Sequence, residues 1–214
     1  MDAAEYDAWY QTPHGSWIGD IEFRLLTELL APEEGETLLD VGCGTGYFAR
    51  RFARECGQSV VGLDPNPAWL RFARSKTAAG EAYIAGNGVA LPFPDRSFDR
   101  SIAIASLCFV KDQRRFMNEM VRVTRKRFAI GLLNRAGPLY RQKGRHGGSG
   151  AYRGAHWHTA AEIRALLDGL PVANLVIRTG VFLPSGGWPG RWAERVLPRC
   201  LPWGSFLVAA GDRS

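Results

Sequence analysis

The sequence is poor in the features that mark secreted or membrane-spanning chains. No apolar run approaches the length of a membrane span. The first ten residues carry three acidic side chains and no apolar core, so we expect no secretory leader. The four cysteines, at positions 43, 56, 108 and 200, form no C-x-x-C pair. This pattern favours a reduced, cytoplasmic setting.

Histidine is also scarce, and the four histidines give no pattern typical of a metal site. His156 and His158 have a spacing that suits ligands on a strand, but no cysteine or acidic residue accompanies them at ligand spacing. We therefore predict no metal. With 214 residues, a hydrophobic content of 46% and no internal repeat, the chain fits one globular domain with a sizeable core.

Positive charge is unevenly distributed. The net charge is +6, but the stretch from Lys111 to Arg145 contains eleven Lys or Arg and two acidic residues, which amounts to +9 and leaves −3 for the rest. Such a stretch fits nucleic acid, an anionic substrate, an anionic membrane or a solvated helix face. Aromatic residues are not interleaved with it up to Arg135, so we do not expect nucleic acid as the main partner.

One stretch carries the clearest local signal. The apolar run that contains Leu38 and Leu39 ends in Asp40, and glycines follow at positions 42, 44 and 46 before a helical pattern begins. Glycine lacks a Cβ, so the backbone can turn sharply and approach a ligand. The amides that open the next helix point at such a ligand. A second acid, Asp64, ends the next apolar run, where a carboxylate can accept hydrogen bonds from both hydroxyls of a ribose.

Strand and helix patterns alternate after a helical, aromatic-rich start at 1–34. The predicted strands are 36–41, 59–63, 82–85, 99–105 and 128–133, with helices between them. This alternation indicates a parallel sheet with helices on both faces. Residues 134–158 are basic, glycine-rich and without a clear period. A helix at 159–168, strands at 174–182 and 205–210, and a short helix near 192–196 complete the prediction.

Three motifs together resemble those of class I S-adenosylmethionine (SAM)-dependent methyltransferases. They are Asp-Val-Gly-Cys-Gly-Thr-Gly at 40–46, Gly-Leu-Asp-Pro-Asn at 62–66 and Leu-Pro-Phe-Pro-Asp-Arg-Ser-Phe-Asp at 91–99. The chain is similar over about residues 36–135 to the small-molecule "type 11" branch, which also holds ubiquinone-type methyltransferases. The resemblance implies a Rossmann-like α/β fold whose seven-stranded sheet is mostly parallel, with an antiparallel edge strand and helices on both faces.

The resemblance also implies SAM as the cofactor and S-adenosylhomocysteine as its product. The glycine turn would hold the methionine part, Asp40 the ammonium and Asp64 the ribose. The loop at Asn87 and Gly88, where the family often has Asp-Ala, would contact the adenine. The positions expected to bind the cofactor are Asp40, Gly42, Cys43, Gly44, Gly46, Asp64, Pro65, Asn87, Gly88 and Ser106.

The chain divides into four expected parts within one domain. Residues 1–34 form a helical cover, 35–135 the SAM-binding core, 136–158 a basic, mobile insertion or lid, and 159–214 the C-terminal helix and edge strands. The residues expected to line the acceptor site are Tyr6, Tyr10, Trp17, Tyr140, Arg141 and His156. A base is needed only if the acceptor loses a proton. The candidates are Tyr6, Tyr10, His14, His156 and His158, of which we favour Tyr10, His14 and His156.

The sequence therefore predicts a methyltransferase that acts by in-line displacement on a small molecule, and the basic lid would favour an anionic one. Motifs for methylation of nucleobase or glutamine amines, of cytosine C5 and of catechols are missing. Two alternatives stay open. One is a SAM-binding regulator without catalysis. The other is an NAD(P)-dependent oxidoreductase, because residues 44–49 also satisfy G-x-G-x-x-A with Asp64 about 20 residues further on. The oligomeric state is open.

Overall fold

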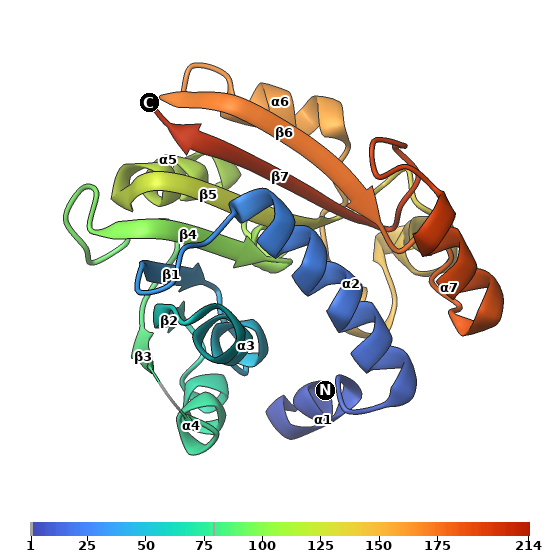
Figure 1. The fold of residues 1–214 in the computed structure, drawn as a ribbon, viewed down its shortest axis with the longest axis horizontal. Coiled ribbons are helices and arrows are strands. Elements are labelled where there is room, and N and C mark those ends of the chain that lie inside the picture. Colours follow the sequence, from blue (N-terminus) through green and yellow to red (C-terminus); the bar gives the residue numbers. More distant parts are fainter. Residues whose placement is uncertain (1, 79) are drawn as a thin grey trace.

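A seven-stranded sheet forms the centre of the computed structural model, which describes residues 2–78 and 80–214 (Figure 1). The strands are β1 (Thr37–Val41), β2 (Ser59–Asp64), β3 (Glu81–Ala85), β4 (Phe98–Ile104), β5 (Thr124–Leu133), β6 (Val172–Gly180) and β7 (Phe206–Arg213). Their order in space is β3-β2-β1-β4-β5-β7-β6. The first five strands are parallel, and β7 pairs antiparallel with β5 and β6. The predicted fold class is confirmed.

Helices cover both faces of this sheet. They are α1 (Ala3–Trp9), α2 (Pro13–Leu30), α3 (Tyr47–Cys56), α4 (Pro67–Ser75), α5 (Gln113–Val123), α6 (Ala160–Leu167) and α7 (Gly187–Val196). Successive strand residues point to opposite faces. Leu38 of β1 therefore packs in the core beneath α2, α3 and α4, whereas Leu39 packs in the core beneath α5 and α6. Both side chains are fully buried, as expected for a central parallel strand.

Capping residues set where the helices begin and end. Thr12 caps α2 by accepting a hydrogen bond from the Gly15 amide, and Asp112 caps α5 by accepting one from the Arg115 amide. Gly57 ends α3 in the left-handed region with φ +63°. Asp112 and Gly57 are residue types typical of these N-cap and C-cap positions. They fix the lengths of the connections between helices and strands.

The segment 136–158 is built of short helical turns at Tyr140–Gly144, Arg145–Gly147 and Gly150–Tyr152. Its far end is attached to the sheet, because the His158 amide donates to the Leu133 carbonyl at 2.9 Å and the Arg135 amide donates to the His158 carbonyl at 2.8 Å. Trp157 is buried in the core beneath α5 and α6. The segment thus contains local turns, and its end is attached to the sheet through Trp157 and His158. Neither feature was apparent from the hydrophobic periodicity of the sequence.

In the described parts of the chain, 2–78 and 80–214, no helix combines the length and the apolar character that crossing a bilayer requires.

Candidate functional site

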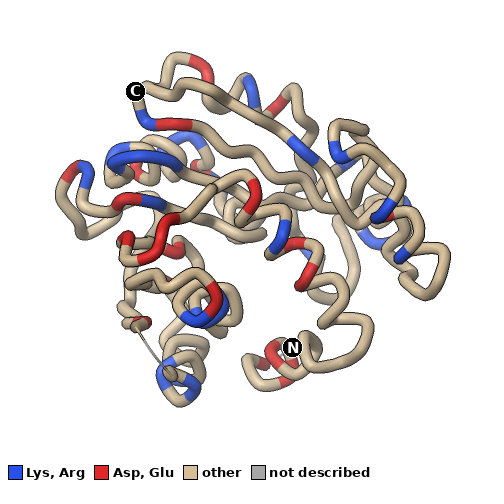
Figure 2. Tube along the Cα trace, in the orientation of Figure 1, with Lys and Arg blue, Asp and Glu red and all other residues tan. Residues whose placement is uncertain are grey.

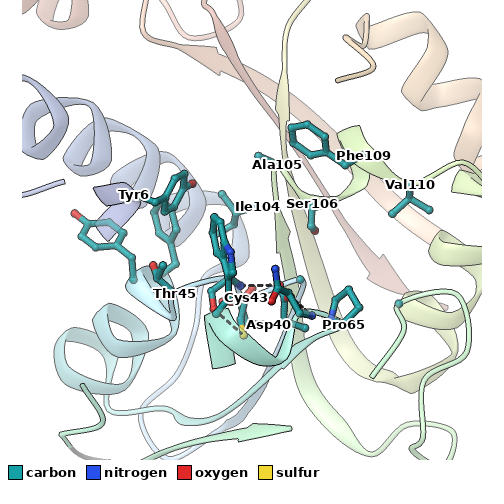
Figure 3. Close-up of a pocket in the computed structure, with 18 of the residues that line it drawn as sticks. Tyr6, Asp40, Cys43, Thr45, Pro65, Ile104, Ala105, Ser106, Phe109 and Val110 are labelled. Carbon is teal, nitrogen blue, oxygen red and sulfur yellow. Dashed lines mark hydrogen bonds between the residues drawn. The ribbon is translucent and has the colours of Figure 1, made fainter. Parts of the chain in front are cut away.

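A cavity of about 500 Å³ lies at the carboxyl ends of β1, β2 and β4 (Figure 3). The strand order reverses between β1 and β4, which is where open α/β sheets bind ligands. The volume is in the range of small-molecule sites. The lining residues are Tyr6, Tyr10, Asp40, Gly42, Cys43, Gly44, Thr45, Tyr47, Phe48, Asp64, Pro65, Asn66, Trp69, Asn87, Gly88, Ile104, Ala105, Ser106, Phe109, Val110, Phe116 and Ala151.

The glycine turn after β1 forms the floor of this cavity. Gly42 has φ +79°, a conformation that side chains rarely adopt, and a Cβ built on it would lie 2.3 Å from the Cβ of Ser106. The amides of Gly42 and Cys43 both donate to the carbonyl of Leu63, at 2.6 and 3.0 Å. The turn is therefore held against β2, and the missing Cβ of Gly42 lets the side chain of Ser106 pack against it.

Asp64 is fixed by two backbone amides at the end of β2. Its Oδ2 accepts from the Gly44 amide at 2.9 Å, and its Oδ1 accepts from the Asn66 amide at 2.8 Å. Each carboxylate oxygen has a further lone pair. Because both oxygens are oriented by the backbone, the carboxylate can accept two more hydrogen bonds from a diol in the cavity without first being ordered.

Asp40 is a buried carboxylate, and no described residue serves as its counter-ion. Its side chain lies at the end of β1 and the residue is 2% exposed. Burial, with a smaller contribution from Asp64, raises the pKa of Asp40 to about 8. Throughout residues 2–78 and 80–214, no donor forms a hydrogen bond or ion pair with this carboxylate. A cationic group of a ligand would therefore stabilise the ionised form.

The loops after β3 and β4 form the opposite wall. The amide oxygen of Asn87 accepts from the Val89 amide at 3.1 Å, and Gly88 packs closely against Phe116. Ala105 has φ +58°, a strained conformation for a residue with a Cβ. Ser106 donates its hydroxyl proton to the Val41 carbonyl at 2.6 Å, so it ties β4 to β1 at the cavity rim.

An aromatic wall closes the cavity on the side of α1 and α3. The ring of Tyr10 stacks on Tyr47 at 3.8 Å, and the ring of Tyr6 lies 5.1 Å from Trp69. The hydroxyls of Tyr6 and Tyr10 are 3.3 Å apart. Burial raises the pKa of both phenols, so both stay protonated at neutral pH. They suit hydrogen-bond donation to an acceptor better than proton removal.

Apart from His158, sequence reasoning placed six residues at the site that the structure places elsewhere. Gly46 lies behind the turn, where it caps α3 and faces Tyr83. Trp17 packs on Gly186 and Gly190, and the ring of His14 lies beside it at 5.9 Å. The other three, in or next to the segment's short turns, are Tyr140, Arg141 and His156.

Those last three residues have other contacts. Tyr140 packs on Trp157 at 5.4 Å between ring centroids, and Arg141 lines a second groove beside α7. His156 donates its backbone amide to the Cys108 carbonyl at 2.7 Å, and its ring lies 4.5 Å from that of His158. Burial lowers the pKa of His158 to about 4, so that imidazole is neutral at pH 7. Neither histidine lines the cavity.

Several lining residues escaped the sequence analysis. Tyr47, Phe48 and Trp69 lie in the first turns of α3 and α4. Their spacing in the sequence indicates only that they belong to amphipathic helices. Phe109, which is 53% exposed, and Val110 follow the strained turn after β4. The only signal in the sequence that could have identified these residues is their position just after a predicted parallel strand. Residues within one turn of the carboxyl ends of such strands lie near the same edge of the sheet.

Comparison with known proteins gives a consistent picture. Residues 39–128 match a family model described as a methyltransferase domain, type 11. An uncharacterized protein of Mycobacterium tuberculosis is 37% identical over 190 residues, which is 86% of this chain and 63% of that protein. A malonyl-[acyl-carrier protein] O-methyltransferase of Serratia marcescens is 36% identical over 130 residues, 58% of this chain and 50% of that protein. The chain thus spans less than two thirds of the length of these relatives.

A solved structure shares nearly the whole fold. A SAM-dependent methyltransferase of Thermotoga maritima, described as a possible histamine N-methyltransferase, superposes with a TM-score of 0.79 at 24% sequence identity, over 99% of this chain and 95% of that one. The sheet and its glycine turn define the class I SAM-dependent methyltransferase fold. Within that fold, residues 39–128 are similar to a methyltransferase domain. This similarity favours a methyltransferase over the nicotinamide oxidoreductase alternative.

Proposed function

We propose that this protein binds SAM in the cavity at the ends of β1, β2 and β4 and transfers its methyl group to a small-molecule acceptor. The observation that carries the proposal is the pair of carboxylates at one cavity. Asp64 is ordered by two amides, and Asp40 is buried with no counter-ion among the residues that the structure describes. SAM combines the two groups that these carboxylates match, a ribose diol and an ammonium.

The lining residues fit the cofactor part by part. Asp64 would accept from the ribose hydroxyls, Asp40 would face the ammonium, and Gly42 and Gly44 would admit the methionine part. The loop at Asn87 and Gly88 would border the adenine. When bound, SAM supplies a methyl group activated by its sulfonium. The protein's task is to exclude water and to hold the acceptor in line.

The acceptor would sit between the rim at Ser106 and the aromatic wall. Tyr6 and Tyr10 present their hydroxyls there, and Phe109 and Val110 supply apolar surface. None of the residues known to line the cavity is Lys or Arg. The expectation of an anionic acceptor therefore depends on the segment 136–158, of which only Ala151 lines the cavity in this conformation.

The segment 136–158 would act as the lid. Ala151 reaches the cavity from its last turn, while its end is anchored by Trp157 and His158. Gly147, Gly148 and Gly150 have positive φ values, which permits a rearrangement of the turns between these points. Two expectations rest on the sequence alone: that the protein is cytoplasmic, and that nucleic acid is not its main partner.

Calorimetric titration of SAM tests the proposed binding site. Asp64→Ala should weaken SAM binding by about 1.5 to 3 kcal/mol, the scale of hydrogen bonds to a charged group. Asp168→Ala is the matched control, because this exposed carboxylate lies beyond α6 and outside the cavity. Unchanged SAM affinity in folded Asp64→Ala would contradict the proposed site.

Catalysis is tested separately from binding. Metabolite pools incubated with the protein and SAM should yield a product heavier by one methyl group, together with S-adenosylhomocysteine. Tight SAM binding without any such product across broad pools would favour the alternative, a SAM-binding regulator. The acceptor found in this way would also decide whether it carries a negative charge.

A further inference from the structure

The outer face of α7 carries an apolar row where a helix of a water-soluble domain normally carries polar residues. Trp188, Trp192 and Val196 are spaced four residues apart and therefore lie in one row along the helix. Trp188 is 78% exposed and Trp192 is 56% exposed. The buried side of α7 is formed by the small residues Gly190 and Ala193. The tryptophans thus lie on the exposed side of the helix.

The row continues into a groove of about 750 Å³ beside the helix. Trp203, which is 58% exposed, adds a third indole from the connection to β7. The other lining residues are almost all apolar, namely Ala136, Pro138, Phe182, Leu183, Pro189, Ala193 and Leu197, together with Arg141. In Figure 1, α7 lies at the right-hand margin of the molecule. An apolar patch of this kind on a surface marks an interaction site.

The charge around the patch is positive. Arg191 and Arg195 are exposed and form a second row on α7 beside the tryptophans. The acidic residue of this helix, Glu194, turns inward, where its Oε1 accepts from the Phe182 amide at 2.6 Å. The neighbouring segment 134–158 has five Lys or Arg and no acidic residue. Figure 2 shows mainly Lys and Arg at this end of the molecule.

We propose that the face formed by α7, Trp203 and Arg141 docks on a lipid surface that carries anionic headgroups. Indole rings favour the boundary between headgroups and acyl chains, because they join an apolar body to an N–H donor. Arginines beside them face the negative surface potential. A helix with one apolar aromatic row and a basic flank lies in the plane of such an interface rather than crossing it.

The docked face adjoins the catalytic cavity through one segment. Ala136 and Arg141 line the groove at the start of the segment 136–158, and Ala151 lines the cavity near its end. Docking would therefore hold the lid against the lipid surface. The docking itself does not depend on the proposed methyl transfer, so the two can fail separately.

Vesicle co-sedimentation tests the proposal with two lipid compositions. The wild-type protein should sediment with vesicles of phosphatidylcholine containing about 30% phosphatidylglycerol and bind pure phosphatidylcholine far more weakly. Its tryptophan fluorescence should shift to shorter wavelength on binding. Trp188→Ser with Trp192→Ser should weaken binding at least about tenfold and remove most of the shift.

Charge reversal gives a second variant whose folding is less at risk. Arg191→Glu with Arg195→Glu should weaken binding, and about 0.5 M salt should weaken wild-type binding in the same way. Arg71→Glu with Arg96→Glu is the matched control, because these exposed arginines lie on α4 and before β4. It has the same net charge change and should bind nearly as well as the wild type.

Three results would overturn the proposal. The folded wild type could fail to bind the anionic vesicles, the tryptophan variant could bind as tightly as the wild type, or the control pair could lose as much binding as the α7 pair. A dimer in sedimentation velocity that the tryptophan variant dissociates, without vesicle binding, would assign the patch to a second copy of the chain instead.

Discussion

At the scale of single residues, the proposed contact of the buried Asp40 with the cofactor's ammonium would link cofactor binding to pH. Burial raises its pKa to about 8, so the free protein holds Asp40 largely protonated below that pH. An ammonium bound beside it favours the carboxylate, and binding then releases a proton. SAM affinity should therefore rise between about pH 6 and 7.5 and level off near pH 8, where an α-amino group itself loses its proton.

Calorimetry in buffers of different ionisation enthalpy measures this proton release directly. Asp40→Asn should bind SAM more weakly and lose most of the pH dependence. If the variant keeps the same rise in affinity from pH 6 to 7.5, another group is responsible and the assignment of Asp40 to the ammonium is wrong.

Gly42 offers a second prediction at this scale. Gly42→Ala adds a Cβ in a left-handed conformation and places it 2.3 Å from Ser106, so both backbone strain and a clash arise. Gly35→Ala is the matched control, because Gly35 has φ +82° and nothing within 4 Å of a built Cβ. The free energy of unfolding of the control, measured in urea, should fall only by the cost of a left-handed backbone with a Cβ, about 1 to 2 kcal/mol. Gly42→Ala should lose clearly more, and equal losses would show that the close contact is unimportant.

At the scale of elements, the segment 136–158 can be separated from the cofactor site. Deletion of residues 142–150 removes the exposed middle of the segment and spares Ala151 and the buried Trp157. SAM binding should stay within about twofold, because the proposed cofactor contacts come from the strand ends. Turnover should fall sharply or the KM for the acceptor should rise. Normal turnover by the deletion variant would exclude a lid.

The elements up to residue 135 could be predicted because their signals are local. The apolar run before Asp40 marks β1, and the glycine after α3 marks the end of that helix, each within a few residues. The ends of β1 and β2, and the carboxylates located there, could therefore be predicted from the sequence. Trp17 was assigned to the acceptor site because it is aromatic and N-terminal. Its actual neighbours, Gly186 and Gly190, lie far along the chain, and their missing side chains leave space for the indole. The hydrophobic pattern of the sequence does not indicate such a long-range contact.

At the scale of the whole molecule, the free energy of unfolding should depend on pH through Glu22. This half-buried residue of α2 lies between the buried Ile18 and Leu26, one turn before and one turn after it, and desolvation raises its pKa to about 8. The unfolded chain releases the proton near pH 4.3. Between these values the folded state binds more protons, so the stability that this group contributes is present below about pH 4.3 and is lost as pH rises to about 8.

Glu22→Gln should therefore become more stable relative to the wild type as pH increases, by more than about 1 kcal/mol between pH 5 and 8. Urea unfolding at several pH values measures the difference. Glu28→Gln, on the exposed side of the same helix, is the control and should show no such trend. A constant offset between wild type and Glu22→Gln would mean that Glu22 titrates normally in the folded state.

The position of β7 has a consequence for how the molecule is made. This strand is later in the chain than β5 and β6, yet it lies between them and pairs with both. While the chain is being synthesised, β5 has an open hydrogen-bonding edge and β6 has no partner until residues 206–213 emerge. An unpaired edge of this kind attracts other strands. Ribosome-bound chains ending before residue 206 should therefore be the aggregation-prone stage of biogenesis.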